Sequence, residues 1–163
     1  MPENEIDFFS VFEVLAKHDV EFIITGGVSA VLMGAPVTTF DLDIIHLRTE
    51  ENINKLLLAL DELDAHYRLR RDIKIKPQRQ ALEGKGHHLL LTTCGPLDIL
   101  GTVGNELSYP DILPEIEQIE VDSCVLQVQS LASLIKLKRT IGRAKDLLTI
   151  PILQRTIDEQ NEE

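Results

Sequence analysis

The chain has 163 residues, 44 % of them hydrophobic, no tryptophan and a formal net charge of −11. This length suits one compact domain, and the acidic balance argues against nonspecific coating of nucleic acid. No apolar run approaches the roughly 20 residues of a bilayer span, and the first residues lack the features of a signal peptide. The two cysteines, Cys94 and Cys124, form neither a disulfide framework nor a metal knuckle, so we expect a cytoplasmic protein. The lack of a long apolar run predicts that it is not attached to a membrane.

The predicted elements mix helices with strands. In chain order we expect a helix over 8–16, a strand over 21–25 that ends at two glycines, a short helix over 28–33, a strand over 41–46, a helix over 49–60, an extended segment over 66–75, a polar connection over 76–87, hairpins over 88–101 and 116–128, and helices over 130–141 and 144–160. This order predicts an α/β or α+β domain with a C-terminal helical region.

Basic residues are gathered in two segments of this acidic chain. Residues 67–86 and 130–145 together carry most of the 16 lysines and arginines. Such local concentration favours a site for an anion such as phosphate. Solvated helix and strand faces are the alternative.

Two carboxylates stand on one face of an otherwise aliphatic strand. Asp41 and Asp43 point the same way, about 7 Å apart along the strand, and would repel each other unless water, a cation or a basic side chain neutralised them. Asp98 repeats the pattern inside Leu97-Asp98-Ile99-Leu100. Three acids on neighbouring strands suit Mg²⁺, which prefers oxygen ligands. Acids that cap a turn or lie at a sheet edge are the alternative.

Gly26 and Gly27 separate the strand over 21–25 from the following helix. Such a junction exposes backbone N–H groups that suit a phosphate, glycine allows a close approach, and Ser29 could add a hydroxyl. The segment matches neither GxxxxGK[ST] nor GxGxxG, and glycine also serves such turns for geometry alone.

In combination, these motifs resemble a known family. The stretches IITGGVSAVLMGAPVTTFDLDII, GPLDILGTVG and LASLIKLKRTIGRAKDLL are similar to the nucleotidyltransferase superfamily with the DNA polymerase β-like core, and within it to small bacterial proteins of the abortive-infection and toxin–antitoxin type. The resemblance spans residues 23–148. It implies a mixed sheet flanked by helices, and we expect a catalytic core over 1–129 with C-terminal helices over 130–163 packed on it.

The resemblance also implies roles for particular residues. The nucleoside triphosphate, such as ATP, would be held by Gly26, Gly27, Ser29 and Lys138, the two Mg²⁺ ions (or Mn²⁺) by Asp41, Asp43 and Asp98, with Thr39 and Asp146 in support. Asp98 would also help to activate the attacking hydroxyl. One position departs from the family: Val37 stands where relatives often carry arginine, so either another basic residue serves the phosphates or activity is reduced.

Lys138 stands out independently of the resemblance. At about 100° per residue it falls on the apolar stripe formed by Leu131, Leu134, Ile135 and Ile141. A lysine on a packed face must find an anion or extend to water. A triphosphate or a catalytic carboxylate would satisfy it, and a structural ion pair with Asp146 is the alternative.

The sequence therefore predicts Mg²⁺-dependent transfer of a nucleotidyl group from a nucleoside triphosphate to a hydroxyl on RNA, a tRNA end or a protein side chain. A cognate antitoxin-type protein is an expected partner. The first alternative is a catalytically weak or inactive nucleotide-binding or protein-interaction module with the same fold. The second is an ordinary structural domain whose acids are solvated at a sheet edge.

Overall fold

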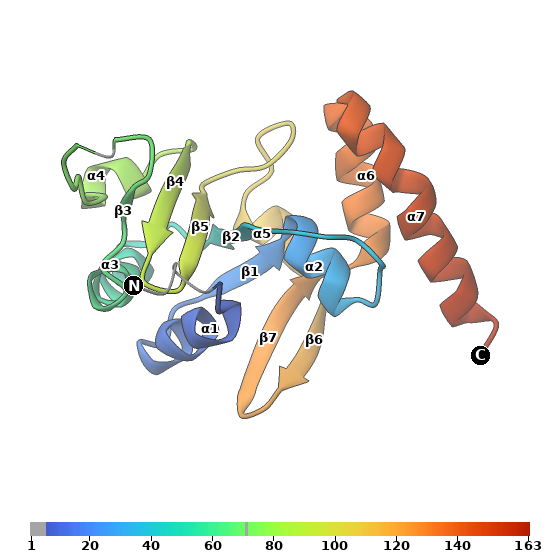
Figure 1. Ribbon diagram of the computed structural model, residues 1–163, viewed down its shortest axis with the longest axis horizontal. Coiled ribbons are helices and arrows are strands. Elements are labelled where there is room, and N and C mark those ends of the chain that lie inside the picture. The colour runs from blue at the N-terminus through green and yellow to red at the C-terminus, as the bar shows by residue number, and fades with distance from the viewer. Residues whose placement is uncertain (1–5, 71) are drawn as a thin grey trace.

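The computed structural model describes residues 6–70 and 72–163 (Figure 1). Its strands are β1 (Phe22–Thr25), β2 (Leu42–His46), β3 (His66–Tyr67), β4 (His87–Thr92), β5 (Gly95–Leu100), β6 (Ile116–Val121) and β7 (Cys124–Gln129). Its helices are α1 (Phe8–Lys17), α2 (Gly26–Leu32), α3 (Glu50–Glu62), α4 (Arg79–Leu82), α5 (Tyr109–Ile112), α6 (Leu131–Ile141) and α7 (Ala144–Asn161), and a 3₁₀ turn, η1 (Leu113–Glu115), follows α5.

The strands form one mixed sheet in the order β3-β4-β5-β2-β1-β7-β6. β2 runs antiparallel to β1 and parallel to β5, and β7 runs parallel to β1. The mixed sheet expected from the sequence is therefore confirmed. β1 (FIIT) and β2 (LDIIH) are mostly apolar and almost wholly buried because packed residues cover both faces of the central strands.

Hydrophobic clusters lie on both faces of the sheet. Ile24 and Ile44 contribute to the larger cluster, which α1, α3 and α4 cover, whereas their neighbours Ile23 and Ile45 point into a second cluster with residues of α5 and α6. A third cluster joins α2, α6 and α7. Figure 1 shows α6 and α7 side by side at the end of the molecule opposite α3 and α4.

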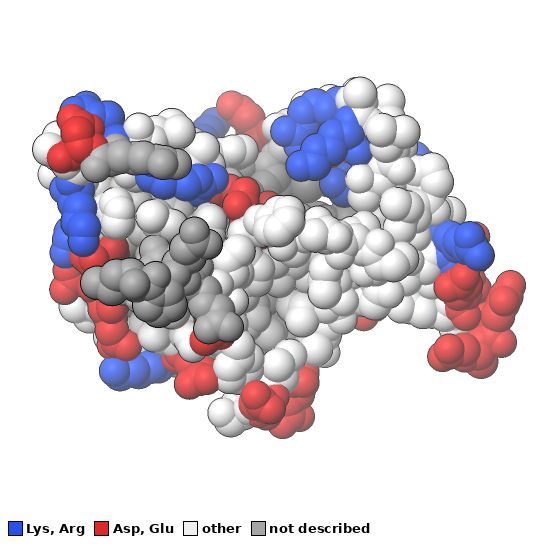
Figure 2. Space-filling view, viewed as in Figure 1, with Lys and Arg blue, Asp and Glu red and all other residues white. Residues whose placement is uncertain are grey.

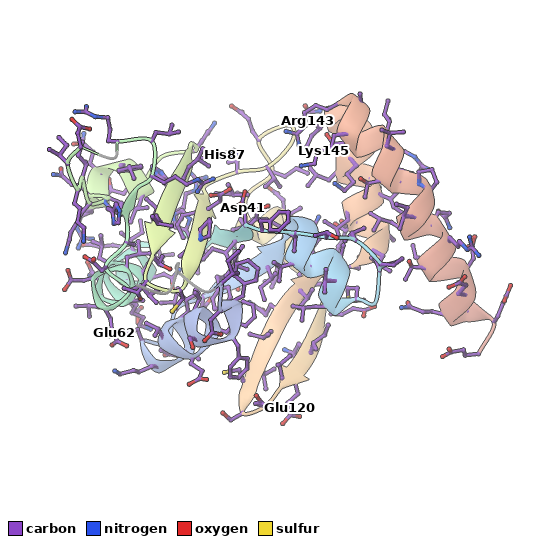
Figure 3. All side chains as sticks on the ribbon, viewed as in Figure 1. Asp41, Glu62, His87, Glu120, Arg143 and Lys145 are labelled. Carbon is purple, nitrogen blue, oxygen red and sulfur yellow. The ribbon has the colours of Figure 1, made fainter. Side chains whose placement is uncertain are left out.

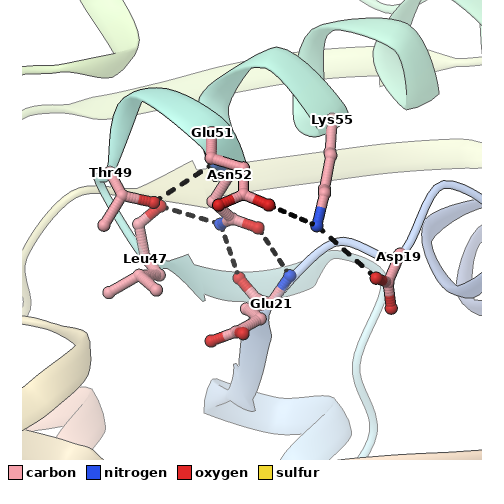
Figure 4. Close-up of polar contacts among 7 residues, drawn as sticks. All are labelled: Asp19, Glu21, Leu47, Thr49, Glu51, Asn52 and Lys55. Atoms are coloured by element: carbon pink, nitrogen blue, oxygen red, sulfur yellow. Dashed lines mark hydrogen bonds and ion pairs between the residues drawn. The ribbon is translucent and has the colours of Figure 1, made fainter.

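The first turn of α3 is tied to the central strands by the buried Asn52. Its side chain accepts a hydrogen bond from the backbone N–H of Glu21 at 2.7 Å and donates to the carbonyls of Glu21 at 2.9 Å and Leu47 at 2.7 Å (Figure 4). Thr49 caps the helix by accepting from the Asn52 N–H. These bonds fix the helix against the start of β1 and the end of β2.

Some local expectations were wrong. The helix expected over 28–33 begins at Gly26, so both glycines belong to its first turn. The connection expected over 76–87 contains α4, whose Leu82 is buried. Of the described residues in the segment expected to be extended over 66–75, His66 and Tyr67 form the strand β3. α5 and η1 were not predicted. In the part of the chain that the structure describes, no helix has both the length and the apolar character needed to cross a bilayer.

Candidate active site

The register of the central strands brings two acids together. Asp43 of β2 is paired with Asp98 of β5 on one side and with Thr25 of β1 on the other. Neighbouring strands lie about 4.8 Å apart, so both carboxylates occupy one small area of one sheet face. Asp41 lies just before β2, and all three acids line the same cleft. Because β2 and β5 are central strands, Asp43 and Asp98 do not lie at a sheet edge, whereas Asp41 lies outside the strands with 48 % of its side chain exposed.

Gly26 and Gly27 make room for side chains that enter from β2 and the segment before it. A Cβ atom on Gly26, whose φ is +68°, would lie 2.3 Å from Asp43 Oδ2. A Cβ atom on Gly27 would lie 2.6 Å from Thr39 Oγ1. The hydroxyl of Thr39 in turn donates a hydrogen bond to the Asp41 carbonyl at 3.1 Å. Both glycines are thus required by the close approach of the acidic segment to the start of α2.

The negative charge on this face is only partly compensated. Burial, followed by the charge and a hydrogen bond of Asp98 and by the charge of Asp41, raises the pKa of Asp43 to about 8, and Arg68 opposes this effect. Burial alone can raise the pKa of a carboxyl group by several units, and nearby negative charges raise it further. Such positions are typical of functional sites.

Arg68, which follows β3, is the cation nearest to two of these acids among the described residues. Its Nη1 donates to Asp98 Oδ1 at 2.5 Å and to the Leu90 carbonyl at 3.1 Å. Its Nη2 lies 3.9 Å from Asp41 Oδ2. The basic segment 67–86 was visible in the sequence, but the role of Arg68 was not predicted. Arg71, from the same segment, lies outside the described residues.

The acids face a cleft of about 500 Å³ whose opposite wall belongs to α6 and α7. That wall carries Lys138, Arg143 and Lys145, and Figure 3 shows the latter two where α6 gives way to α7. In Figure 2 basic side chains gather at this end, across a hollow from acidic ones. Gly26, Gly27, Thr39 and the exposed Phe40 also line the cleft. The cleft therefore presents opposite charges on its two walls.

Lys138 is paired within this wall. Its Nζ lies 3.3 Å from Asp146 Oδ1, and Arg143 Nε donates to Asp146 Oδ2 at 2.6 Å. Burial raises the pKa of Asp146, but the hydrogen bonds from Arg143 and Lys138 outweigh burial, and the pKa lies below its usual value. The ion pair considered from the sequence is present, and Lys138 nevertheless lines the cleft.

Ser29 differs from its expected position. Its side chain is fully buried, and its hydroxyl donates to the Gln129 carbonyl at 2.7 Å. It is not among the described residues that line the cleft. Ser29 thus ties α2 to the end of β7, and it would have to leave this bond to meet a phosphate.

The donor set on the sheet suits a hard divalent cation. Asp41, Asp43 and Asp98 offer carboxylate oxygens only, and their excess negative charge calls for a cation. Among residues 6–70 and 72–163, no three acidic, histidine or cysteine side chains already converge on one point as metal ligands. Arg68 bridges two of the acids in this arrangement. The residues fit Mg²⁺ in chemistry, provided that Arg68 can leave.

Comparison with known proteins identifies the fold. No family model and no curated protein matches the chain. A crystal structure from Thermotoga maritima, of a protein provisionally described as a nucleotidyltransferase, matches with a TM-score of 0.58 over 93 % of this chain and 91 % of that one, at 18 % sequence identity. The chain therefore has a nucleotidyltransferase-like fold.

Proposed function

We propose that this protein transfers a nucleotidyl group from a nucleoside triphosphate to a hydroxyl acceptor in a Mg²⁺-dependent reaction. The observation that carries the proposal is the grouping of Asp41, Asp43 and Asp98 on one face of the central strands, with too little positive charge around Asp43. The fold shared with the Thermotoga protein supports it. The cleft volume of about 500 Å³ lies within the usual range of small-molecule sites.

The acidic wall of the cleft would hold the metal ions, and the basic wall would bind the phosphates. Asp41 and Asp43 would hold two Mg²⁺ ions and Asp98 one of them. Bound magnesium would supply alignment of the attacking hydroxyl with the α-phosphate and stabilisation of the oxygens that attack and leave. Lys138, Arg143 and Lys145 line the other wall and offer positive charge to the phosphates, in place of the arginine that Val37 does not provide.

The proposed reaction forms one bond and breaks one. The acceptor oxygen bonds to the α-phosphorus, and the bond from that phosphorus to the oxygen bridging to the β-phosphate breaks. Pyrophosphate leaves with the electron pair. The carboxylate of Asp98 accepts the proton of the acceptor hydroxyl and passes it to water. RNA, including a tRNA end, or a protein side chain would supply the hydroxyl, and the basic residues of 67–86 favour a polyanionic acceptor.

The resemblance to toxin–antitoxin proteins extends this proposal to a partner. A cognate antitoxin-type protein would then bind the chain and block the transfer. Co-expression with the product of a neighbouring gene, followed by the transfer assay described next, tests this extension.

Incubation of the protein with labelled nucleoside triphosphates, Mg²⁺ and total RNA or cell protein tests the proposal. We expect label transfer by the native protein and its loss in Asp41→Asn. Asp122→Asn is a matched control because Asp122 lies exposed in the remote β6–β7 turn, where its φ of 52° also suits asparagine. Equal transfer by all three proteins would rule the mechanism out.

A second function, nucleotide binding without turnover, is favoured by one observation. Arg68 already pairs with Asp98, the residue that would accept the proton. ATP titration by calorimetry, followed by a pyrophosphate-release assay on the same sample, separates the two functions. Saturable binding without pyrophosphate release would support this version.

A further inference from the structure

Arg68 holds the acidic face of the cleft in a specific way. Its guanidinium uses one nitrogen for Asp98, at 2.5 Å, and for the Leu90 carbonyl, while the other nitrogen reaches toward Asp41 at 3.9 Å. The Arg68 and Asp98 side chains are 24 % and 12 % exposed. Charge-assisted bonds of this kind are short and strong when partly shielded from water. Two of the three proposed metal ligands are thus engaged by one internal cation.

The backbone of Arg68 is anchored, while its guanidinium is held by hydrogen bonds to Asp98 and the Leu90 carbonyl. The Arg68 N–H donates to the Leu89 carbonyl at 3.1 Å, next to the β3–β4 pairing. Release of the acids therefore needs only a change of side-chain rotamers and leaves the sheet intact. Asp41, Asp43 and Asp98 themselves line the cleft, so open space already exists beside the acids.

A divalent cation bound by Asp98 and Asp41 would lie close to the Arg68 guanidinium, which already occupies one oxygen of Asp98. They would compete for the Asp98 and Asp41 oxygens, and they would repel each other at such short distance. The protein that binds the ion is then the fraction in which Arg68 has swung away, and apparent affinity falls in proportion to that fraction.

We propose that Arg68 is a displaceable internal counterion, which neutralises Asp98 and Asp41 in the ion-free protein and must leave before a divalent cation binds there. This inference rests on the proposed function, because it takes these acids as the metal ligands. Arg68 thus sets the metal affinity of the site from outside the ligand set. It also keeps the ion-free acids from repelling one another.

Titration with Mn²⁺ alone, followed by the loss of the EPR signal of the free aqueous ion, tests the inference. Arg68→Met keeps most of the side-chain length and removes the charge. We expect it to bind Mn²⁺ about tenfold more tightly than the native protein, within the usual 5–150-fold range of coupling between linked equilibria. Arg70→Met is the matched control, because Arg70 is an exposed neighbour paired with Asp72, and its affinity should stay within about twofold of native.

A second variant and a second measurement guard against a folding defect. Arg68→Lys keeps the charge but loses the two-pronged contact, and we expect its affinity to lie between native and Arg68→Met. Mn²⁺ should also raise the melting temperature of Arg68→Met by more than that of the native protein.

The outcomes separate this inference from the proposed function. Unchanged Mn²⁺ affinity in both Arg68 variants would overturn the inference alone. Weaker binding would also overturn it and would make Arg68 a residue that orients Asp98 for the ion. Absence of Mn²⁺ binding in the native protein and in every variant would overturn the Mg²⁺-dependent function as well.

Discussion

At Gly26 the side chain of Asp43 fills the space that a Cβ atom would need. The backbone there has a φ of +68°, and an added Cβ would lie 2.3 Å from the carboxylate oxygen. Gly26→Ala therefore combines backbone strain with displacement of Asp43. We expect a loss of about 1–3 kcal/mol in the free energy of unfolding, measured by urea titration, together with loss of Mn²⁺ binding.

Gly86→Ala provides the control for this prediction. Among the described atoms beyond its chain neighbours, none lies within 4 Å of a Cβ built on Gly86. Its free energy of unfolding should change by less than about 0.5 kcal/mol. A Gly26→Ala protein as stable as Gly86→Ala would mean that the acids have room to move.

Phe40 offers a direct report on the cleft, because the chain contains no tryptophan. The side chain is 67 % exposed and lines the cleft beside Asp41. Phe40→Trp would place the only indole of the protein there. We expect ATP with Mg²⁺ to change its fluorescence saturably, whereas Leu148→Trp, at an exposed position on α7 that is absent from the cleft lining, should not respond. Equal responses at both positions would contradict binding in the cleft.

Residues differ in how far the sequence reveals them. Asp43 and Asp98 stand out because each interrupts a mostly aliphatic strand, and Asp41 because it lies directly before one, so these anomalies are local. Ser29 was misleading because its partner, the Gln129 carbonyl, lies 100 residues away. Arg68 could not be singled out among its basic neighbours, since its partners depend on how β3 pairs with β4 and β4 with β5. Residues that are unusual within their own segment could be predicted from the sequence, whereas side-chain partners that depend on strand register could not.

At the scale of elements, α3 depends on a single amide. Asn52→Ala would remove the side-chain partner of the Glu21 N–H and of the Leu47 carbonyl, whereas the Glu21 carbonyl keeps its bond from the Leu47 N–H at 3.3 Å. We expect the free energy of unfolding to fall by about 2–3 kcal/mol, because unsatisfied buried polar groups are costly. Asn54→Ala, at an exposed position of the same helix, is the control in urea titration and should cost below about 1 kcal/mol. Equal losses would show that the amide contacts of Asn52 add no specific stability, because alanine favours the helix at both positions.

Two buried histidines connect strands to their neighbours: His46 ties β2 to α4, and His88 ties β4 to β3. The Nε2 of His46 donates to the Leu82 carbonyl at 2.8 Å, and the Nδ1 of His88 is hydrogen-bonded to the Tyr67 hydroxyl. No described residue partners the remaining ring nitrogens. Burial lowers the pKa of both residues below the ordinary value of 6.5.

These depressed pKa values predict loss of stability in mild acid. Below pH 6.5 the unfolded chain takes up protons that the folded chain refuses, so the free energy of unfolding falls as pH decreases, by up to about 1.4 kcal/mol per pH unit for each histidine. His46→Gln keeps a donor for Leu82 and should flatten this dependence between pH 7.5 and 5.5. His87→Gln is the control. His87 directly precedes His88, is exposed and lies on the opposite face of the sheet, so this variant should keep the native pH dependence. Parallel slopes for native protein and His46→Gln would contradict the prediction.

Elements also differ in how far they could be predicted. α3 and α6 begin at Thr49 and Ser130 caps that the sequence displays, and both were predicted closely. α4 was missed because only Leu82 of its four residues is buried, so it shows no periodicity. β3 is short because it pairs with β4 at two positions only, a fact that depends on the partner strand.

At the scale of the whole molecule, the cleft lies between the central strands and the C-terminal helices, which contribute side chains of opposite charge. The central strands supply acids from a face that is otherwise packed, whereas α6 and α7 supply basic residues at a solvent-exposed junction. Another residue at position 43 would make the ion-free fold more stable, because burial of the crowded Asp43 carboxylate is unfavourable. A site of this kind exchanges stability of the ion-free fold for affinity toward a cation.

Asp43→Asn measures that exchange. The pKa of Asp43 is raised to about 8 in the fold from 3.8, so the folded protein holds a proton that the unfolded chain lacks across this range. The contribution of Asp43 to native stability should therefore fall as pH rises from about 4 to 8, opposite in sign to the contribution of the two histidines. In EDTA at pH 8 we expect the free energy of unfolding of Asp43→Asn to exceed that of the native protein by about 1–2 kcal/mol, or about 2–8 °C in melting temperature, and this gain to be lost at pH 5.

At saturating Mg²⁺ the native protein should become the more stable of the two, because it alone gains about 2.7 kcal/mol from the ion at 100 times its dissociation constant. Calorimetric melting curves of native protein, Asp43→Asn and the control Asp122→Asn test this, and a variant that melts below the native protein in EDTA at pH 8 would show that the Asp43 carboxylate stabilises the fold.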